Sequence, residues 1–296
     1  MAGIVPSLDE LNALDRHSFV SALGRIFENA PWVAERAFAE RPFATVADLH
    51  RAMTQAVAGV AEAEQLGLIR GHPELGSKVA RAGTMTEESR REQGSLGLDR
   101  LSQAEFARFE RLNAAYLERF GFPFVICVRR HTRDSLLDSF ERRLGNSLET
   151  ERAAALAEIG QITRLRLVEE VDGPGKPKTN GQLSTHVLDT VSGRPAAGVR
   201  IVLTERGASA EGLLEDTVTN ADGRTDEPLL GGVPLRIGTY EIAFHIGAYF
   251  AAKGAATASP PFLDVVPIRF AIAEPEGHYH VPLLASPWSY ATYRGS

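Results

Sequence analysis

The sequence has a single cysteine, Cys127, so no disulfide can form within one chain. Many secreted proteins depend on disulfides, and their absence favours a reducing, cytoplasmic location. Cys127 lies in the apolar run FPFVICV, which predicts a position in the core. The first residues, MAGIVPSLDELN, lack the basic and long apolar segments of a secretory signal, so we expect none.

The chain also lacks long apolar runs and an excess of basic residues. No run approaches the roughly 20 residues of a membrane-spanning helix, so a membrane partner is not expected. Lys and Arg number 22 before residue 172 and 10 from there on, against 25 and 13 Asp and Glu. Both parts are therefore acidic, and nucleic-acid binding is not expected.

From residue 9 to about 170 the apolar residues recur at helical spacing. In SQAEFARFERLNAAYLERF, Ser102 and Glu105 predict a capping box at a helix start. TVADLHRAMTQAVAGVAEAEQLG predicts a helix that begins at Thr45 and stops at Gly67. The pattern predicts an all-α bundle over residues 1–171.

The segment DGPGKPKTNG, residues 172–181, has the Gly, Pro and Lys content of a linker. Beyond it the apolar period changes to two, as in VRIVLTE and TYEIAFHIGAYF, which predict strands. IRFAIAEPEGHYHVPLL predicts two more strands around a Pro-Glu-Gly turn. Residues 182–296 are therefore predicted to form a β-sandwich. The whole chain is expected to be multidomain, with an all-α part followed by an all-β part.

Three motifs of the second half carry a resemblance to a known family. LSTHVLDTVSGRPAAGV, NADGR and the terminal YHVPLLASPWSYATYRGS resemble the 5-hydroxyisourate hydrolases, transthyretin-related enzymes of urate breakdown. Transthyretin, a carrier with the same sandwich, lacks the terminal Tyr-Arg-Gly-Ser. The resemblance implies a transthyretin-like fold and a homotetramer with sites at subunit interfaces. It implies catalytic roles for His186, Arg224, His280 and Ser296 and a substrate-binding role for Tyr293.

The chemistry of these residue types agrees with ring hydrolysis. Imidazole, with an ordinary pKa of about 6.5, suits the removal of a proton from water, so His186 and His280 are assigned to that task. Arg224 offers a planar fork of donors to an anionic heterocycle. As structural alternatives, a strand histidine often only forms hydrogen bonds, and Arg224 beside a turn is by default a solvated charge. His278 and His280 share one side of a strand, as a zinc pair does, although the resemblance implies no metal.

The first half carries a second resemblance. RGHPELG, SRREQGSLGLD, RFGFPFVICV and EIGQITRLRL, in that order, resemble the 2-oxo-4-hydroxy-4-carboxy-5-ureidoimidazoline (OHCU) decarboxylases, which are also all-α and also act in urate breakdown. The resemblance covers residues 10–170 and implies that His72 and Glu92 are catalytic. The substrate contacts that it implies are Pro73, Ser89, Gln93, Phe124, Val125, Ile126, Cys127, Val128 and Arg166.

Loss of CO2 leaves electron density on a carbon beside an imine and a carbonyl, which the ring can delocalise, so no cofactor is expected. An acid–base pair must move a proton, and an arginine must bind the anionic substrate. We expect Glu92 to fix the tautomer of His72 and to raise its pKa. As alternatives, Ser89 and Glu92 also fit a capping box, and Arg166 fits a solvated helix face.

Together the resemblances imply a bifunctional enzyme of urate degradation. The second half would hydrolyse 5-hydroxyisourate to OHCU, and the first would decarboxylate OHCU to (S)-allantoin, with fusion raising the local concentration of the intermediate. We expect a homo-oligomer, a tetramer through the sandwich with dimer contacts between decarboxylase halves. The alternatives are a transthyretin-like carrier with a helical assembly domain, a zinc-dependent amidohydrolase that uses His278 and His280, and a chain with one inactive half.

Overall fold

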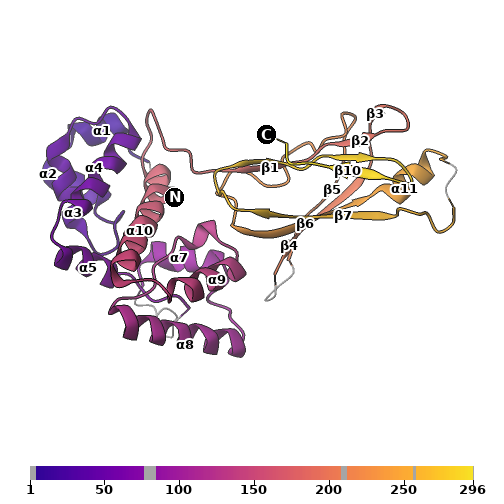
Figure 1. The fold of residues 1–296 in the computed structure, drawn as a ribbon. Helices are drawn as coiled ribbons and strands as arrows, with labels where there is room; N and C mark the ends of the chain where they lie inside the picture. Colours follow the sequence, from indigo (N-terminus) through magenta and orange to yellow (C-terminus); the bar gives the residue numbers. More distant parts are fainter. Residues whose placement is uncertain (1–4, 77–84, 208–211, 256–257, 296) are drawn as a thin grey trace. The chain divides into compact units, whose positions relative to one another are not determined.

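The computed structural model describes residues 5–76, 85–207, 212–255 and 258–295. The chain divides into two compact units. One consists of Met1–Arg129 and Leu136–Thr179, and the other of Arg130–Ser135 and Asn180–Ser296. The first is built from helices and the second mainly from strands (Figure 1), which confirms the prediction of an all-α part followed by an all-β part.

The helical unit consists of short helices near its start and longer helices toward its end, around one apolar core. The elements are α1 (Leu8–Ala13), α2 (Arg16–Leu23), α3 (Pro31–Ala37), η1 (Phe38–Glu40), α4 (Val46–Ala58), α5 (Glu62–Arg70), α7 (Glu87–Ser95), α8 (Gln103–Phe120), η2 (Val128–Arg130), α9 (Arg133–Arg143) and α10 (Leu148–Glu170).

Local chemistry sets several helix ends. The predicted capping box is present at α8, where the Ser102 hydroxyl accepts from the backbone N–H of Glu105 and the Glu105 carboxylate accepts from that of Ser102. Thr45 caps α4 as predicted. The predicted stop at Gly67 is wrong, because α4 ends near Gly59 and α5 runs through Gly67 to Arg70. Leu68 and Ile69, just beyond Gly67, are buried, so helical backbone there places apolar side chains in the core.

The 23-residue helix α10 packs against α4 and α5 (Figure 1). One side of α10 contributes Ala155, Ile159 and Leu167 to the apolar core. Arg166 is buried on the same helix, so α10 carries a charge into the interior of the unit.

The range predicted as a linker, 172–181, has backbone hydrogen bonds in both units. In the helical unit, the Val46 N–H donates to the Pro174 carbonyl at 3.0 Å, at the start of α4. In the other unit, the Gly181 N–H donates to the Val233 carbonyl at 3.1 Å. Both ends of this Gly- and Pro-rich stretch are therefore anchored to the unit next to them.

The second unit is a sandwich of two four-stranded sheets, with strand orders β10-β9-β2-β3 and β5-β4-β6-β7, and a parallel β1-β8 pair (Figure 1). Buried residues of both sheets, such as Val187 and Leu283 on one and Ile201 and Phe244 on the other, share one core. The elements are β1 (Gln182–Ser184), β2 (Val187–Asp189), β3 (Arg194–Pro195), β4 (Arg200–Arg206), β5 (Gly212–Val218), β6 (Gly238–His245), α11 (Ile246–Ala252), β7 (Val265–Ile272), β8 (His278–His280), β9 (Leu283–Ala285) and β10 (Tyr290–Thr292).

One expectation about these strands is wrong in detail, and another is confirmed. TYEIAFHIGAYF does not continue as a strand, because β6 ends at His245 and α11 follows. The buried residues Ile246, Tyr249 and Phe250 are spaced three and four apart, which is helical spacing. The two strands predicted around the Pro-Glu-Gly turn are present as β7 and β8, which pair with different neighbours, β7 with β6 and β8 with β1.

A short segment from earlier in the chain, Arg130–Ser135, also belongs to the second unit. The Thr132 N–H donates to the Ile237 carbonyl at 3.0 Å, and the Ile237 N–H donates to the Arg130 carbonyl at 2.8 Å. The Arg130 guanidinium pairs with Glu276 at 3.0 Å. This segment therefore satisfies backbone groups and a charge of the unit.

Candidate active sites

A cavity of about 30 Å³ lies in the helical unit, between the end of α5, helix α7, the segment before η2, and α10. Every substrate or catalytic residue predicted for this half lines it except Cys127, whose N–H donates to the Glu158 carboxylate at 2.9 Å. The sequence did not predict two apolar residues of the wall, Leu75 and Ile162. The lining residues are His72, Pro73, Leu75, Ser89, Glu92, Gln93, Phe124, Val125, Ile126, Val128, Ile162 and Arg166.

His72 presents a free ring nitrogen in this cavity. Its Nδ1 lies 3.0 Å from the Leu68 carbonyl, which can only accept, so Nδ1 carries the proton. Its Nε2 is buried and has no hydrogen-bond partner among the described residues. Burial lowers the pKa of His72, so the ring is neutral near pH 7 and Nε2 can accept a proton. The expectation that Glu92 fixes this tautomer and raises the pKa is wrong, since Leu68 fixes the tautomer and burial dominates.

Glu92 is held by Arg166 through two parallel hydrogen bonds, from Nε to Oε1 at 2.9 Å and from Nη2 to Oε2 at 2.8 Å. Arg166 is only 3% exposed, so it is not on a solvated helix face. The capping-box alternative for Ser89 and Glu92 is also wrong, because Thr86 caps α7 by accepting from the Ser89 N–H. Ser89 and Glu92 both lie inside the helix and face the interior.

Glu28 is a member of this cluster that the sequence did not reveal. Its carboxylate accepts from Arg166 Nη1 at 2.9 Å, Thr86 Oγ1 at 2.6 Å and Ser89 Oγ at 3.0 Å. Burial alone would raise the pKa of Glu28, but the Thr86 hydrogen bond and the Arg166 charge outweigh it and the pKa is lowered. Arg166 therefore lies between two carboxylates, and with both ionised the three side chains carry a net charge of −1.

A buried polar network supports the backbone of the predicted substrate segment. Arg143 Nη1 donates to the Val125 carbonyl at 2.9 Å, and Arg143 Nε donates to Glu151 at 2.7 Å. The Tyr116 hydroxyl donates to the same Glu151 carboxylate. Because these groups are buried and paired, they fix the position of Val125 in the cavity wall.

The sandwich brings together three of the residues predicted for the second half. His186 follows β1, His280 lies in β8, and Arg224 follows the NADG turn. Burial and then the Arg224 charge lower the pKa of both histidines, which places all three side chains within electrostatic range. The Val187 N–H donates to the Gly223 carbonyl at 2.8 Å and ties the turn to the strand beside His186.

The two imidazoles differ in their surroundings. His186 Nε2 is buried without a partner in the described part of the chain. His280 Nδ1 lies 3.0 Å from the Ser184 hydroxyl, which also lies 3.2 Å from His278 Nε2. The sequence did not predict Ser184, although it stands two residues before His186 in LSTHVLD and pairs with His280 in the β1–β8 register.

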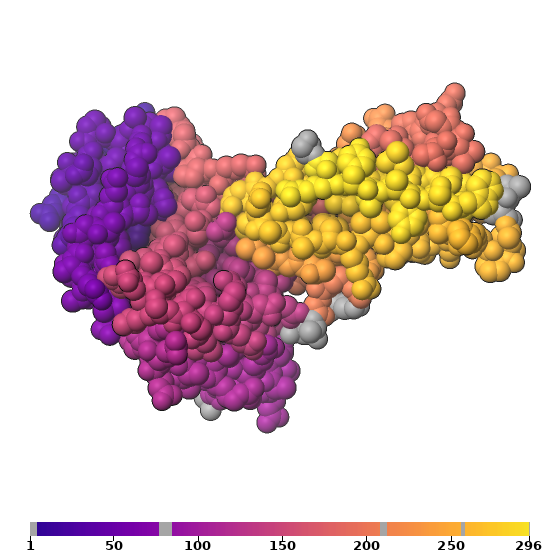
Figure 2. All heavy atoms as spheres, viewed as in Figure 1, coloured from indigo at the N-terminus to yellow at the C-terminus, as the bar shows by residue number. Residues whose placement is uncertain are grey.

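The end of the chain is tied to His280. The Gly295 N–H donates to the His280 carbonyl at 2.8 Å, and a Cβ at Gly295 would lie 2.7 Å from His280 Cδ2. The Arg294 guanidinium covers the Tyr279 ring at 4.8 Å. Tyr293 is 59% exposed, and Figure 2 shows residues near the C-terminus, in yellow, on the surface of the sandwich. Ser296 lies outside the described residues.

In the part of the chain that the structure describes, no group of three or more His, Cys, Asp or Glu side chains is placed to hold a metal ion. Of the helices described, none is both long and apolar enough to cross a bilayer.

Comparison with known proteins links each unit to a family. Residues 12–168 match the family described as OHCU decarboxylase, and residues 183–295 match the HIUase/Transthyretin family. A 2-oxo-4-hydroxy-4-carboxy-5-ureidoimidazoline decarboxylase of Haloferax volcanii is 45% identical over 163 residues, 55% of this chain and 95% of that protein. A 5-hydroxyisourate hydrolase of Deinococcus radiodurans is 55% identical over 115 residues, 38% of this chain and 95% of that protein. A solved (S)-allantoin synthase is 35% identical, with a TM-score of 0.52, and the match covers 98% of this chain and 100% of that one.

Proposed function

Since the chain belongs to both the OHCU decarboxylase and the HIUase/transthyretin families, we propose that it is a bifunctional enzyme of urate degradation. The sandwich hydrolyses 5-hydroxyisourate to OHCU, and the helical unit decarboxylates OHCU to (S)-allantoin. The observation that carries the proposal is a neutral imidazole in each unit, His72 and His186, with a buried Nε2 that has no described hydrogen-bond partner.

In the hydrolysis, a neutral imidazole of His186 or His280 takes a proton from water. The water oxygen bonds to the ring carbonyl carbon, the ring C–N bond breaks, and the leaving nitrogen takes the proton back from the imidazolium. Arg224 holds the anionic ring, with Tyr293 and Ser296 orienting the ring or the water. Because the Arg224 charge disfavours protonated His186 and His280, it also keeps the bases available near pH 7.

In the decarboxylation, the bond between the ring carbon and CO2 breaks, and its electron pair moves into the adjoining imine and carbonyl. The carbon then takes a proton, so each turnover consumes one proton as the anionic substrate becomes a neutral product and CO2. His72 and Glu92 move this proton, with Glu92 fixed by Arg166. Pro73, Ser89, Gln93, Arg166 and the segment from Phe124 to Val128 hold the ring.

We also propose a homotetramer through the sandwich, with dimer contacts between helical units. Strands β7 and β10 stand at the sheet edges, and Trp288, Tyr290 and Tyr293 are exposed around β10. Edge strands and exposed aromatic side chains are typical of interfaces. Light scattering after size exclusion tests this proposal, which a monomeric mass would contradict. A reducing, cytoplasmic location is consistent with a buried Cys127 that forms no disulfide.

Circular dichroism with time, after uricase generates 5-hydroxyisourate in place, tests both activities. Wild type should give a rapid and pure (S)-allantoin signal. His280→Ala should leave 5-hydroxyisourate to decay spontaneously, whereas His72→Ala should accumulate OHCU. Slow, racemic product from wild type would reject the enzyme in favour of a carrier. A stoichiometric metal in the active protein would favour the zinc alternative.

A further inference from the structure

A second hollow, of about 440 Å³, adjoins the decarboxylase cavity at Glu92, which lines both. Its lining residues come from α7, from Arg129 of η2 and from the end of α10, and all of them belong to the helical unit. Its lining residues are Arg91, Glu92, Ser95, Arg129, Glu169 and Glu170.

The hollow is lined by two arginines and three glutamates, and one of these, Glu92, is paired with Arg166 of the inner cavity. Arg129 Nη2 lies 2.5 Å from Glu169, and Arg91 Nη2 lies 3.5 Å from the same carboxylate. One carboxylate therefore serves two guanidinium groups, while Glu170 is paired with Arg25. Arg129 is only 20% exposed, so its charge is less screened by solvent than that of a fully exposed arginine.

In the inner cavity, the arginine is already paired with two carboxylates. The Arg166 guanidinium donates hydrogen bonds to Glu28, Glu92 and Ser89, and the cluster of Arg166 with the two glutamates is net negative. The neutral His72 adds no positive charge. An anionic substrate therefore approaches a cavity whose own arginine is already neutralised.

We propose that Arg129 and Arg91 form the capture site for the carboxylate of OHCU and draw this anion toward the inner cavity. The inference rests on the proposed decarboxylase function. Arg129 directly follows Val128, the last residue of the substrate segment, and Arg91 directly precedes Glu92, so both cations flank the reacting groups. A guanidinium presents paired donors that match a carboxylate. Glu169 competes with the substrate carboxylate for the same two arginines.

The sign of each substitution follows from this competition. Arg129→Gln and Arg91→Gln remove attraction and should lower kcat/KM for OHCU. Glu169→Gln frees both arginines and should raise kcat/KM. All three effects should be large at about 10 mM NaCl and small at about 200 mM, because the Debye length falls from about 30 Å to below 8 Å.

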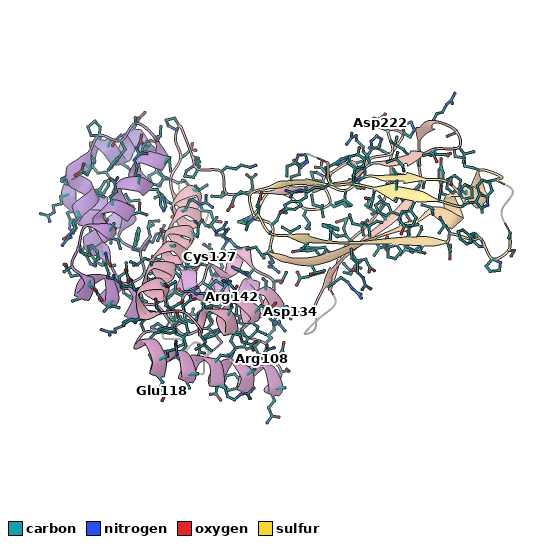
Figure 3. All side chains as sticks on the ribbon, viewed as in Figure 1. Arg108, Glu118, Cys127, Asp134, Arg142 and Asp222 are labelled. Atoms are coloured by element: carbon teal, nitrogen blue, oxygen red, sulfur yellow. The ribbon has the colours of Figure 1, made fainter. Side chains whose placement is uncertain are left out.

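The experiment uses the full chain, with OHCU generated by uricase and the chain's own hydrolase activity. We expect Arg129→Gln to lose about tenfold in kcat/KM at low salt. The matched control is Arg108→Gln, since Arg108 lies on α8 (Figure 3), pairs with Glu141 at 2.6 Å and carries the same charge, but lines neither hollow. The control should retain the wild-type rate and salt dependence.

Equal salt dependence in Arg129→Gln and Arg108→Gln would overturn the capture site. A fall of kcat/KM in Glu169→Gln similar to that in Arg129→Gln would also overturn it, because the ion pair would then serve only structure. A far-UV circular dichroism spectrum of each variant reports whether the helical unit is folded. Absence of decarboxylation in wild type would instead reject the proposed function.

Discussion

Replacement of Glu28 by Gln is the sharpest test of the buried cluster. The substitution preserves the size of the side chain and removes one charge that Arg166 now contacts at 2.9 Å. If the cluster positions Glu92 for proton transfer, Glu28→Gln should slow decarboxylation although Glu28 is not among the residues that line the cavity. Hydrolysis by the same chain should not change.

The magnitude follows from the contacts of Glu28. Its carboxylate accepts from Arg166 and Ser89 on Oε2 and from Thr86 on Oε1, so an amide whose oxygen still accepts from Arg166 must turn its NH2 toward the Thr86 hydroxyl. Hydrogen bonds to a charged group stabilise by about 1.5–3 kcal/mol. Because Glu92 still compensates Arg166, we expect a cost of about 2 kcal/mol, less than the ~3–5 kcal/mol for a buried charge left alone. The melting temperature of the helical unit should fall by roughly 4–8 °C.

Decarboxylation should slow by at least about tenfold, since positioned proton transfer contributes on the order of 100-fold or more. The uricase-coupled dichroism assay separates the two rates, and a far-UV circular dichroism spectrum reports whether the helical unit is folded. Glu141→Gln, which removes the same charge from the surface pair with Arg108, is the matched variant and should be silent. A decarboxylation rate within twofold of wild type in folded Glu28→Gln would refute the positioning role.

Three further predictions concern separate sites. Arg224→Gln should shift the acid limb of the hydrolase kcat/KM profile to higher pH, because the Arg224 charge helps to lower the pKa of His280. A pH–rate series in which the acid limb stays at the wild-type pH would contradict this. Gly295→Ala should slow hydrolysis but not decarboxylation, since its Cβ would lie 2.7 Å from His280 Cδ2, and equal rates in the coupled assay would disprove the contact. His50 has a pKa of about 4 when folded, lowered mainly by burial. Because the unfolded chain takes up a proton at His50 near pH 6.5 and the folded chain does not, the free energy of unfolding keeps its full value above pH 6.5 and falls by about 3 kcal/mol as pH drops to 4. Denaturant unfolding of the helical unit should show this loss in wild type and a smaller one in His50→Gln.

Features with a local cause could be predicted from the sequence. The capping box of Ser102 and Glu105 needs only four consecutive residues, and the helical period of α8 repeats over several turns. The residues around His72 and Glu92 could be grouped because short motifs follow one another in order. The chain then folds so that those motifs line one cavity.

Features that depend on distant partners could not be predicted in this way. Glu28 stands 138 residues before Arg166, and RIFENAPW gives no sign that its carboxylate is buried. The tautomer of His72 is set by the Leu68 carbonyl, one helical turn earlier. Every helix has such carbonyls, so the sequence does not show which of them a histidine ring contacts. In TYEIAFHIGAYF, apolar residues satisfy both a strand period and a helix period, and only the packing of Tyr249 and Phe250 into the sandwich core decides for α11.

The placement of Arg130–Ser135 with the sandwich means that no single break in the chain separates the two units. A fragment that starts at Asn180 would lose the partners of both backbone groups of Ile237 and the cation that faces Glu276. A fragment that stops at Thr179 would contain Arg130–Ser135, but the sandwich residues with which this segment forms hydrogen bonds would be missing. The two reactions are consecutive in chemistry, whereas their scaffolds are interleaved in the polypeptide, so a cut between Thr179 and Asn180 would take six residues away from the sandwich unit.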